Sequence, residues 1–266
     1  MRHPELVFDW NREGWSSPPS VEINDETIRD GLQSATVLDP TLDQKRELLD
    51  LMAGIGVRAA SLGLPATGQQ AFDDVVALAR HVRDARLELE INCAARTLVR
   101  DIEPIVEAVQ RSGQPMVVHT FIGSSPIRMW SEGWDLDFVC KMACSAIDFT
   151  VRQGLEVAFI TEDTTRSSPE VLTPLFRAAI DHGATRLVLC DTVGHATSDG
   201  TRALVRWVRS LIAKTGAEVT IEWHGHDDRG LALTNALAAI ESGADRVHAC
   251  GLGLGERAGN TSTELL

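Results

Sequence analysis

The sequence predicts a (β/α)8 barrel, the architecture of TIM barrels. Short apolar runs alternate strictly with helical patterns, and the alternation gives eight strand candidates and seven complete helices. Each unit spans about 30 residues, and no segment is left over for a second domain. Strict alternation indicates a parallel sheet, and eight units indicate closure into a barrel. An open doubly wound sheet is the alternative, which the absence of a G-x-G-x-x-G turn after the first strand disfavours.

The expected elements follow one another along the chain with turn residues between them. Strands are expected at the short apolar runs 21–24, 59–62, 87–92, 116–121, 156–161, 186–190, 219–224 and 246–250. Helices are expected at 40 or 41–55, 72–85, 99–112, 135–153, 169–182, 199–214 and 231–243. Residues 1–20 show neither period, so they are interpreted as an N-terminal arm that precedes one barrel domain over 21–266.

The eighth helix is expected to be incomplete, because residues 261–266 provide only its beginning. A closed barrel needs a helix over the outer faces of its last and first strands. We therefore expect either downstream residues or a neighbouring chain to cover that gap.

Composition limits the function classes. With 44% hydrophobic and 24% charged residues, the 266-residue chain is typical of soluble globular proteins. Its net charge of −13 disfavours nucleic acid as a partner. No long apolar run or signal peptide is found, so we expect a cytoplasmic protein without a membrane partner. The five cysteines form no C-x-x-C pair and are interpreted as reduced core residues.

Two histidines near the end of the seventh strand suggest a metal site. His224 and His226 stand two residues apart, and side chains at i and i+2 of a strand share one face. They could therefore bind one metal ion. The alternative is two unrelated histidines in a loop at the end of a strand.

Other polar residues follow most of the expected strands, and in a barrel these positions converge on one rim. Among them are Asp25, Glu26, Arg29, Asp30, Gln33, Asn92, His119, Glu162, Thr192, His195 and Asn260. Imidazole, carboxylate and amide donors together suit Zn²⁺, Mn²⁺ or a similar divalent ion. Such an ion polarises a carbonyl group, and Arg29 could neutralise further negative charge on the same substrate.

Six motifs carry a resemblance to a known family. They are DETIRDGLQ, GLPATGQQAFDDV, VHTFIGSSPIRM, CDTVGHAT, HGHDDRGLALTNALAAIESGA and GLGLGERAGN, which occur in this order from residue 21 onward. The sequence resembles the metal-dependent acyl-CoA condensing enzymes, which include 2-isopropylmalate, homocitrate and citramalate synthases. The lyase that cleaves 3-hydroxy-3-methylglutaryl-CoA is a more distant relative of that family.

The resemblance implies a role for particular residues. The metal ligands would be Asp30, His224, His226 and Asn260. The catalytic side chains would be Arg29, Glu162 and His119, with Arg29 on the ketone oxygen of a 2-oxo acid and Glu162 at the acetyl methyl group. The substrate pocket would be lined by Arg29, Gln33, Asn92, His119, Ala158, Ile160 and Thr192, with Thr192 holding the carboxylate. Divalent metal (Zn, Mn or Mg) would be the cofactor and acetyl-CoA the co-substrate.

Two reactions fit these residues. The first is a Claisen-type condensation of acetyl-CoA with a small 2-oxo acid in amino-acid biosynthesis, as in 2-isopropylmalate synthase, by an enzyme expected to be a homodimer. The second is metal-dependent carbon–carbon cleavage of the 3-hydroxy-3-methylglutaryl-CoA lyase type. The GLGERAGN segment favours the synthases. Ala158 stands where homocitrate synthases carry an arginine, which argues against 2-oxoglutarate. His195 and His248 are interpreted as structural or rim residues.

Overall fold

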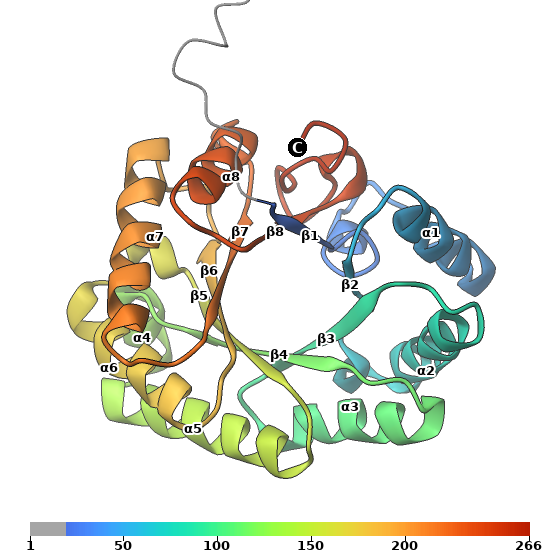
Figure 1. Ribbon diagram of the computed structural model, residues 1–266, viewed down its shortest axis with the longest axis horizontal. Helices are drawn as coiled ribbons and strands as arrows, with labels where there is room; N and C mark the ends of the chain where they lie inside the picture. Colours follow the sequence, from blue (N-terminus) through green and yellow to red (C-terminus); the bar gives the residue numbers. More distant parts are fainter. Residues whose placement is uncertain (1–19) are drawn as a thin grey trace, which may run out of the picture.

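The structure, a computed structural model, describes residues 20–266 and shows a closed barrel of eight parallel strands (Figure 1). The strands are β1 Glu22–Asp25, β2 Ala59–Ser61, β3 Glu90–Arg96, β4 Val117–Gly123, β5 Val157–Glu162, β6 Arg186–Asp191, β7 Thr220–Gly225 and β8 Arg246–Ala249. Each strand pairs with the next, and β8 pairs with β1 to close the sheet. The predicted (β/α)8 barrel is thus confirmed. The expected arm, apart from Ser20, lies outside the described residues.

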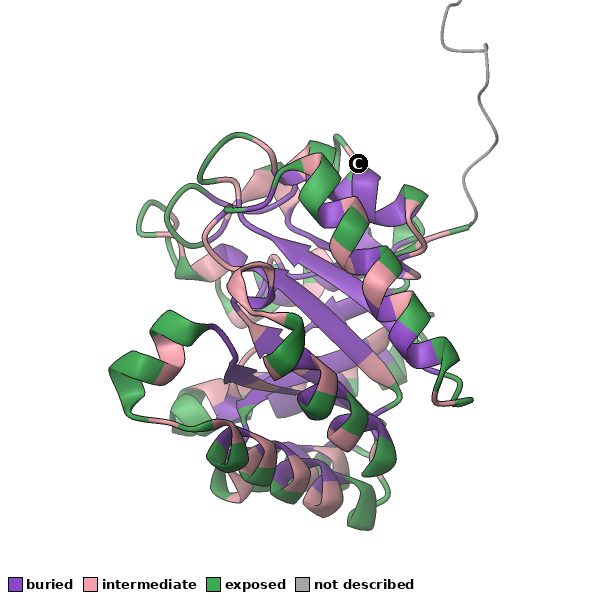
Figure 2. Cartoon of the chain, turned by 90° about the vertical axis from the view of Figure 1, so that its left-hand side faces the viewer, coloured by how far each residue is buried: buried purple, intermediate pink, exposed green. Residues whose placement is uncertain are grey.

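Helices surround the barrel on the outside, between successive strands (Figure 1). They are α1 Leu42–Gly54, α2 Gln69–Asp84, α3 Val99–Ser112, α4 Pro126–Glu132, α5 Leu136–Arg152, α6 Pro169–Asp181, α7 Ser198–Ala213 and α8 Ala232–Glu241. Figure 2 shows the strands buried and the outward faces of the helices exposed. Within residues 20–266, none of the helices combines the length and the apolar character needed to cross a membrane.

Local sequence signals explain where these helices begin and end. Thr41 caps α1 through a capping box with Gln44, in which each side chain bonds the other residue's backbone N–H. Helix α3 ends at Gly113, whose φ of 70° lies in the left-handed region that glycine adopts without strain. Except for α4, the helices pack an apolar face on the outer face of the sheet, and two large apolar clusters fill this layer.

Helix α4 was not predicted. It begins at Ser125, whose hydroxyl accepts a hydrogen bond from the Arg128 backbone N–H at 3.3 Å, with Pro126 in its first turn. It ends at Gly133, which has a φ of 69°. None of its residues is buried, and Trp130 is 83% exposed. The apolar periodicity used for prediction is therefore missing here, although the serine, proline and glycine signals are present in the sequence.

The described chain contains no complete α-helix after β8. The segment that follows forms the 3-10 helix Gly251–Gly253 and then a turn in which the Leu266 N–H donates to the Ser262 carbonyl oxygen at 3.1 Å. This bond joins residues i and i+4, the spacing found in α-helices, but the segment itself is a turn and not a helix. Figure 1 shows the C-terminus between α8 and α1.

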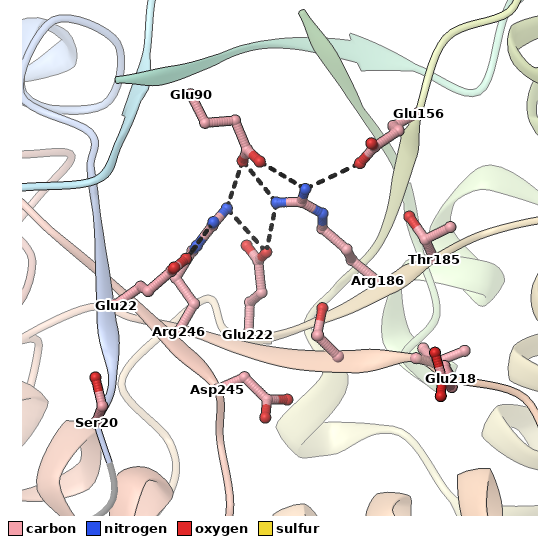
Figure 3. Close-up of a pocket in the computed structure, with 12 residues that line it drawn as sticks. Ser20, Glu22, Glu90, Glu156, Thr185, Arg186, Glu218, Glu222, Asp245 and Arg246 are labelled. Carbon is pink, nitrogen blue, oxygen red and sulfur yellow. Dashed lines mark hydrogen bonds and ion pairs between the residues drawn. The ribbon is translucent and has the colours of Figure 1, made fainter. Parts of the chain in front are cut away.

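The barrel interior is apolar on one side and charged on the other. Val117, Ala158, Val188 and Cys190 form a small apolar cluster from β4, β5 and β6. Charged residues from β1, β3, β6, β7 and β8 fill the N-terminal opening (Figure 3). They pair with one another and are Glu22, Glu90, Arg186, Glu222 and Arg246. The N-terminal face of such barrels is associated with stability, whereas the opposite face carries active sites.

Candidate active site

Three side chains with metal-ligating atoms meet at the C-terminal end of the barrel. His224 lies in β7 and His226 just beyond it, on the same face of the chain, while Asp30 precedes the 3-10 helix Gly31–Gln33 after β1. The two Nε2 atoms are 3.2 Å apart, and Asp30 Oδ2 is 3.6 Å from that of His224 and 3.8 Å from that of His226. One ion could contact all three atoms.

The protonation states of this cluster favour a cation. Burial lowers the pKa of His224 to about 3 and also lowers the pKa of His226. Burial opposes ionisation of Asp30, but the nearby Arg29 guanidinium and the two histidines outweigh it, so the Asp30 pKa is lowered. At neutral pH the cluster therefore offers one carboxylate and two uncharged imidazoles, the forms that bind metal ions.

Asn260 lies beside this donor set. Its Nδ2 donates to Asp30 Oδ1 at 2.8 Å and to the Leu254 carbonyl at 3.0 Å. Its Oδ1 is buried and has no hydrogen-bond partner among the described residues. An unpaired buried acceptor is costly unless something satisfies it, which a cation would do. Gly255 permits this approach, because a Cβ there would stand 2.0 Å from Asn260 Nδ2. The residues present thus fit a divalent ion.

A cavity of about 310 Å³ opens beside the cluster. Asp30, His224 and His226 line it, together with six residues predicted to act in catalysis or substrate binding. The six are Arg29, Gln33, His119, Ile160, Glu162 and Thr192. A small-molecule site of this size is ordinary for a barrel mouth.

Asn92 and Ala158 do not line this cavity. Asn92 is fully buried in β3, and its Nδ2 donates to Asn24 Oδ1 at 2.7 Å. Ala158 packs in the apolar cluster inside the barrel. It faces the same side of β5 as Ile160, but two residues earlier, which places it about 6.6 Å deeper along the strand. The structure therefore does not support the expectation that Asn92 and Ala158 shape the distal end of the pocket.

Three residues that line the cavity differ in their protonation and hydrogen bonding. Burial raises the pKa of Glu162, although Arg128 Nε lies 3.6 Å from its Oε1. The pKa of His119 falls to about 4 on burial, and its Nε2 has no hydrogen-bond partner among the described residues. Thr192 Oγ1 accepts from the Asp163 backbone N–H at 2.8 Å, which leaves its own proton to donate.

Sequence reasoning placed Glu26 on the rim without giving it a role, and it did not find that His248 also lines the cavity. His248 is not on the rim, as one interpretation had it, but 3% exposed inside the barrel, where it contacts Glu26 and Glu222. A signal for this arrangement exists, because Glu222 and His224 are two residues apart in β7 and therefore face the same side. The pattern E-x-H-x-H thus places all three side chains on the inward face of β7 and its continuation, with Glu222 deepest and His226 at the mouth.

Comparisons with known proteins agree with this fold. The profile of the HMGL-like family matches residues 20–266. A 2-isopropylmalate synthase from Pyrococcus abyssi is 37% identical over 246 residues, covering 92% of this chain and 49% of the relative. One from Pyrococcus furiosus is 35% identical over 245 residues, covering 92% of this chain and 48% of the relative.

Solved structures of HMG-CoA lyases share the architecture. The enzyme from Acinetobacter baumannii, in complex with coenzyme A and 3-methylmalate, superposes with a TM-score of 0.74 at 21% identity, covering 92% of this chain and 81% of the other. That from Bacillus subtilis gives 0.72 at 19% identity, covering 93% and 84%. The chain spans about half the length of the curated relatives it matches. By its match over nearly all of the described residues, the chain belongs to the HMGL-like family.

Proposed function

We propose that this chain is the catalytic barrel of an acyltransferase that condenses acetyl-CoA with a small 2-oxo acid to give a 2-hydroxy-2-alkyl dicarboxylic acid. The observation that carries the proposal is the meeting of Asp30, His224 and His226 at a cavity that also contains Arg29 and Thr192. The relatives named 2-isopropylmalate synthase, which align over 92% of the chain, support the same chemistry.

Asp30, His224 and His226 would hold the divalent ion, with Asn260 as a fourth donor. When bound, such an ion is a Lewis acid that polarises a ketone and favours charge development on its oxygen. Three protein ligands and a weak fourth leave positions for substrate oxygens. The mixed nitrogen and oxygen donors fit Zn²⁺, Mn²⁺ or Mg²⁺.

Arg29 and Thr192 would orient the 2-oxo acid. Arg29 has five N–H donors, of which Nε contacts Glu26 and Nη2 contacts Asp30, so others are left for a substrate oxygen. Its side chain is 17% exposed, at the cavity. The Thr192 hydroxyl can donate to the substrate carboxylate. Arg29 would hydrogen-bond the ketone oxygen more strongly as that oxygen gains negative charge, which is how an oriented donor lowers a barrier.

Glu162 is the candidate base for the acetyl methyl group. Its raised pKa makes it a better proton acceptor than an ordinary glutamate, and it lies at the end of β5 on the cavity. In the proposed reaction Glu162 takes a methyl proton, the resulting enolate carbon bonds to the ketone carbon, and the alkoxide is protonated. Hydrolysis of the thioester then releases free CoA.

The cavity walls favour a 2-oxo acid with an apolar substituent. Leu64, Ile160 and Val188 contribute aliphatic surface to the lining. This aliphatic surface supports a small monocarboxylic acceptor over 2-oxoglutarate.

Carbon–carbon cleavage is the second candidate, supported by the shared fold with HMG-CoA lyases and by the segment Arg29–Gln33, which resembles that of the lyases. Cys250 does not favour it. This cysteine is fully buried, is not among the residues lining the cavity, and burial raises its pKa well above the ordinary value. A thiol in that state is a poor acid–base group.

The test assays both reactions on the same preparation of the full-length protein. Release of free CoA from acetyl-CoA is followed with a thiol reagent across a panel of 2-oxo acids, with and without added Zn²⁺, Mn²⁺ or Mg²⁺. The proposal predicts metal-dependent release with at least one acid and no cleavage of 3-hydroxy-3-methylglutaryl-CoA. Cleavage of that thioester without release of CoA from any acid would replace the synthase with the lyase.

A further inference from the structure

Three buried side chains form a row inside the barrel, next to the cavity. His248 of β8 lies between Glu26, which follows β1, and Glu222 of β7. Its Nδ1 is 3.1 Å from Glu26 Oε1, and its Nε2 is 2.8 Å from Glu222 Oε2. The three side chains are at most 2% exposed. A charged trio this deep is costly to bury, so its presence calls for an explanation.

The contacts of His248 indicate the charges in this row. A carboxylate oxygen can accept a hydrogen bond but cannot donate one, so only an imidazole with both nitrogens protonated can donate to Glu222 and also face Glu26 with an N–H. His248 is thus an imidazolium between two carboxylates.

The row connects Arg29 with the charged cluster at the other end of the barrel. At one end, Glu26 Oε2 accepts from Arg29 Nε, while Glu26 Oε1 also accepts from Asn24 Nδ2 at 2.8 Å. At the other end, Glu222 Oε1 lies 3.4 Å from Arg246 Nη1. Figure 3 shows this contact and the further pairs with Glu90. Positive and negative groups alternate along the whole row.

We propose that the row Glu26–His248–Glu222 positions the guanidinium of Arg29 toward the ketone oxygen of the substrate, an inference that rests on the proposed function. Arginine has a flexible side chain, and Glu26 and Asp30 hold Arg29 from two sides. His248 and Asn24 contact Oε1 of Glu26 and so fix the orientation of its carboxylate. Oε2 of Glu26 can then hold Arg29 in one orientation. Misplacement of an oriented group by about 1 Å can cost two orders of magnitude in rate.

Two substitutions test the row, and a third serves as a matched control. Glu26→Gln removes the charge that faces Arg29, and His248→Gln removes the imidazolium that holds Glu26. Glu90→Gln removes a carboxylate at the far end of the same charged network, where it pairs with Arg186 and Arg246 and touches no cavity residue. The three variants are compared by kcat, by KM for the 2-oxo acid, by metal content and by thermal unfolding.

We expect Glu26→Gln and His248→Gln each to lower kcat about 10- to 100-fold, as is typical for residues that orient a site's own ligands. The KM for the 2-oxo acid should change little, because the misplaced group acts mainly on charge formed in the transition state. Glu90→Gln should lower thermal stability and leave kcat unchanged. If the first two variants lose only stability, or if Glu90→Gln loses as much kcat, the row is structural and the proposal is overturned.

A spectroscopic measurement separates this inference from the proposed function. The Nε–H signal of Arg29, assigned by its loss in Arg29→Lys, should be protected from exchange in the wild type and exchange-broadened in both row variants. If the wild type neither condenses nor cleaves a thioester, the proposed function fails, while this signal still decides the positioning role. An unchanged Arg29 signal in His248→Gln overturns the proposal. So does a second bound metal ion that His248→Gln removes, because Glu26, His224 and His248 would then be its ligands.

Discussion

Asp30 serves the candidate site with both of its carboxylate oxygens. Oδ2 faces the two histidines, whereas Oδ1 accepts from Asn260 Nδ2 at 2.8 Å and from the Glu256 backbone N–H at 3.2 Å. The loop after β8 therefore fixes the orientation of a ligand that follows β1. A residue this constrained can present Oδ2, which also accepts from Arg29 Nη2 at 3.3 Å, to a cation at little entropic cost.

Loss of one histidine should remove the metal. His226→Ala should lose bound metal and metal-dependent turnover and keep the native circular dichroism spectrum, because the removed imidazole is one of the three proposed ligands and not part of the apolar clusters. Metal content by mass spectrometry and activity check this. His182→Ala is the control, since His182 pairs with Asp148 on the helical surface. Full metal content in His226→Ala would show that the cluster does not hold the ion.

We expect that Arg29 cannot be replaced by another cation. Arg29→Lys should retain bound metal and lose most of the turnover, because an ammonium group cannot contact Glu26, Asp30 and a substrate oxygen through one planar fork. Steady-state kinetics with metal analysis of the same samples measure both effects. Near-wild-type kcat in Arg29→Lys would mean that only charge is needed at this position.

The sequence predicted the residue types of the site better than their depth. The i, i+2 spacing of His224 and His226 indicated a shared face, and the structure brings them and Asp30 within contact of one ion. Strand periodicity says which face a residue lies on but not which layer of the barrel it occupies, so Ala158 was expected beside Ile160 at the pocket. The two-residue spacing of Glu222 and His224 indicates that Glu222 faces inward, but it does not show that His248 of β8 lies between Glu222 and Glu26.

Among the elements, those with an apolar face were predicted and the one without it was missed. Helix α5 was expected within two residues of its observed bounds, because its apolar face packs on the sheet. Helix α4 buries none of its residues, so only its serine cap, proline and terminal glycine marked it. Packing on the sheet stabilises α5, whereas α4 is marked only by the capping residues at its two ends.

Asp135 marks the boundary between these two helices and should stabilise α5. Its carboxylate accepts from the Phe138 backbone N–H at 2.7 Å, an N-cap bond. Asp135→Ala should lower the free energy of unfolding by about 1 kcal/mol in urea titrations. Asp137→Ala in the first turn removes only an interaction with the helix dipole and should cost less, about 0.3–1 kcal/mol. Equal losses in the two variants would contradict the capping role.

For the whole molecule, buried titratable groups should make stability depend on pH. The His119 pKa falls from 6.5 to about 4 on burial, so below pH 6.5 the unfolded chain takes up a proton that the native state does not. Proton uptake by the unfolded chain at His119 leaves the free energy of unfolding unchanged above pH 6.5. As the pH falls from 6.5 toward 4, it lowers the free energy of unfolding by at most about 1.4 kcal/mol per pH unit. Urea titrations between pH 7 and 4.5 should show a shallower decline for His119→Gln. An identical decline would mean that His119 does not titrate in this way.

The central claim is that this barrel joins the acetyl carbon atoms to a 2-oxo acid. Its most direct test incubates the full-length, metal-loaded protein with acetyl-CoA that carries ¹³C in both acetyl carbons and with the acid that releases most CoA. Mass spectrometry should find both labelled carbons in a 2-hydroxy-2-alkyl dicarboxylic acid, in amounts equal to the free CoA, and neither product in His226→Ala. Label found only in acetate or in unreacted acetyl-CoA would contradict the claim.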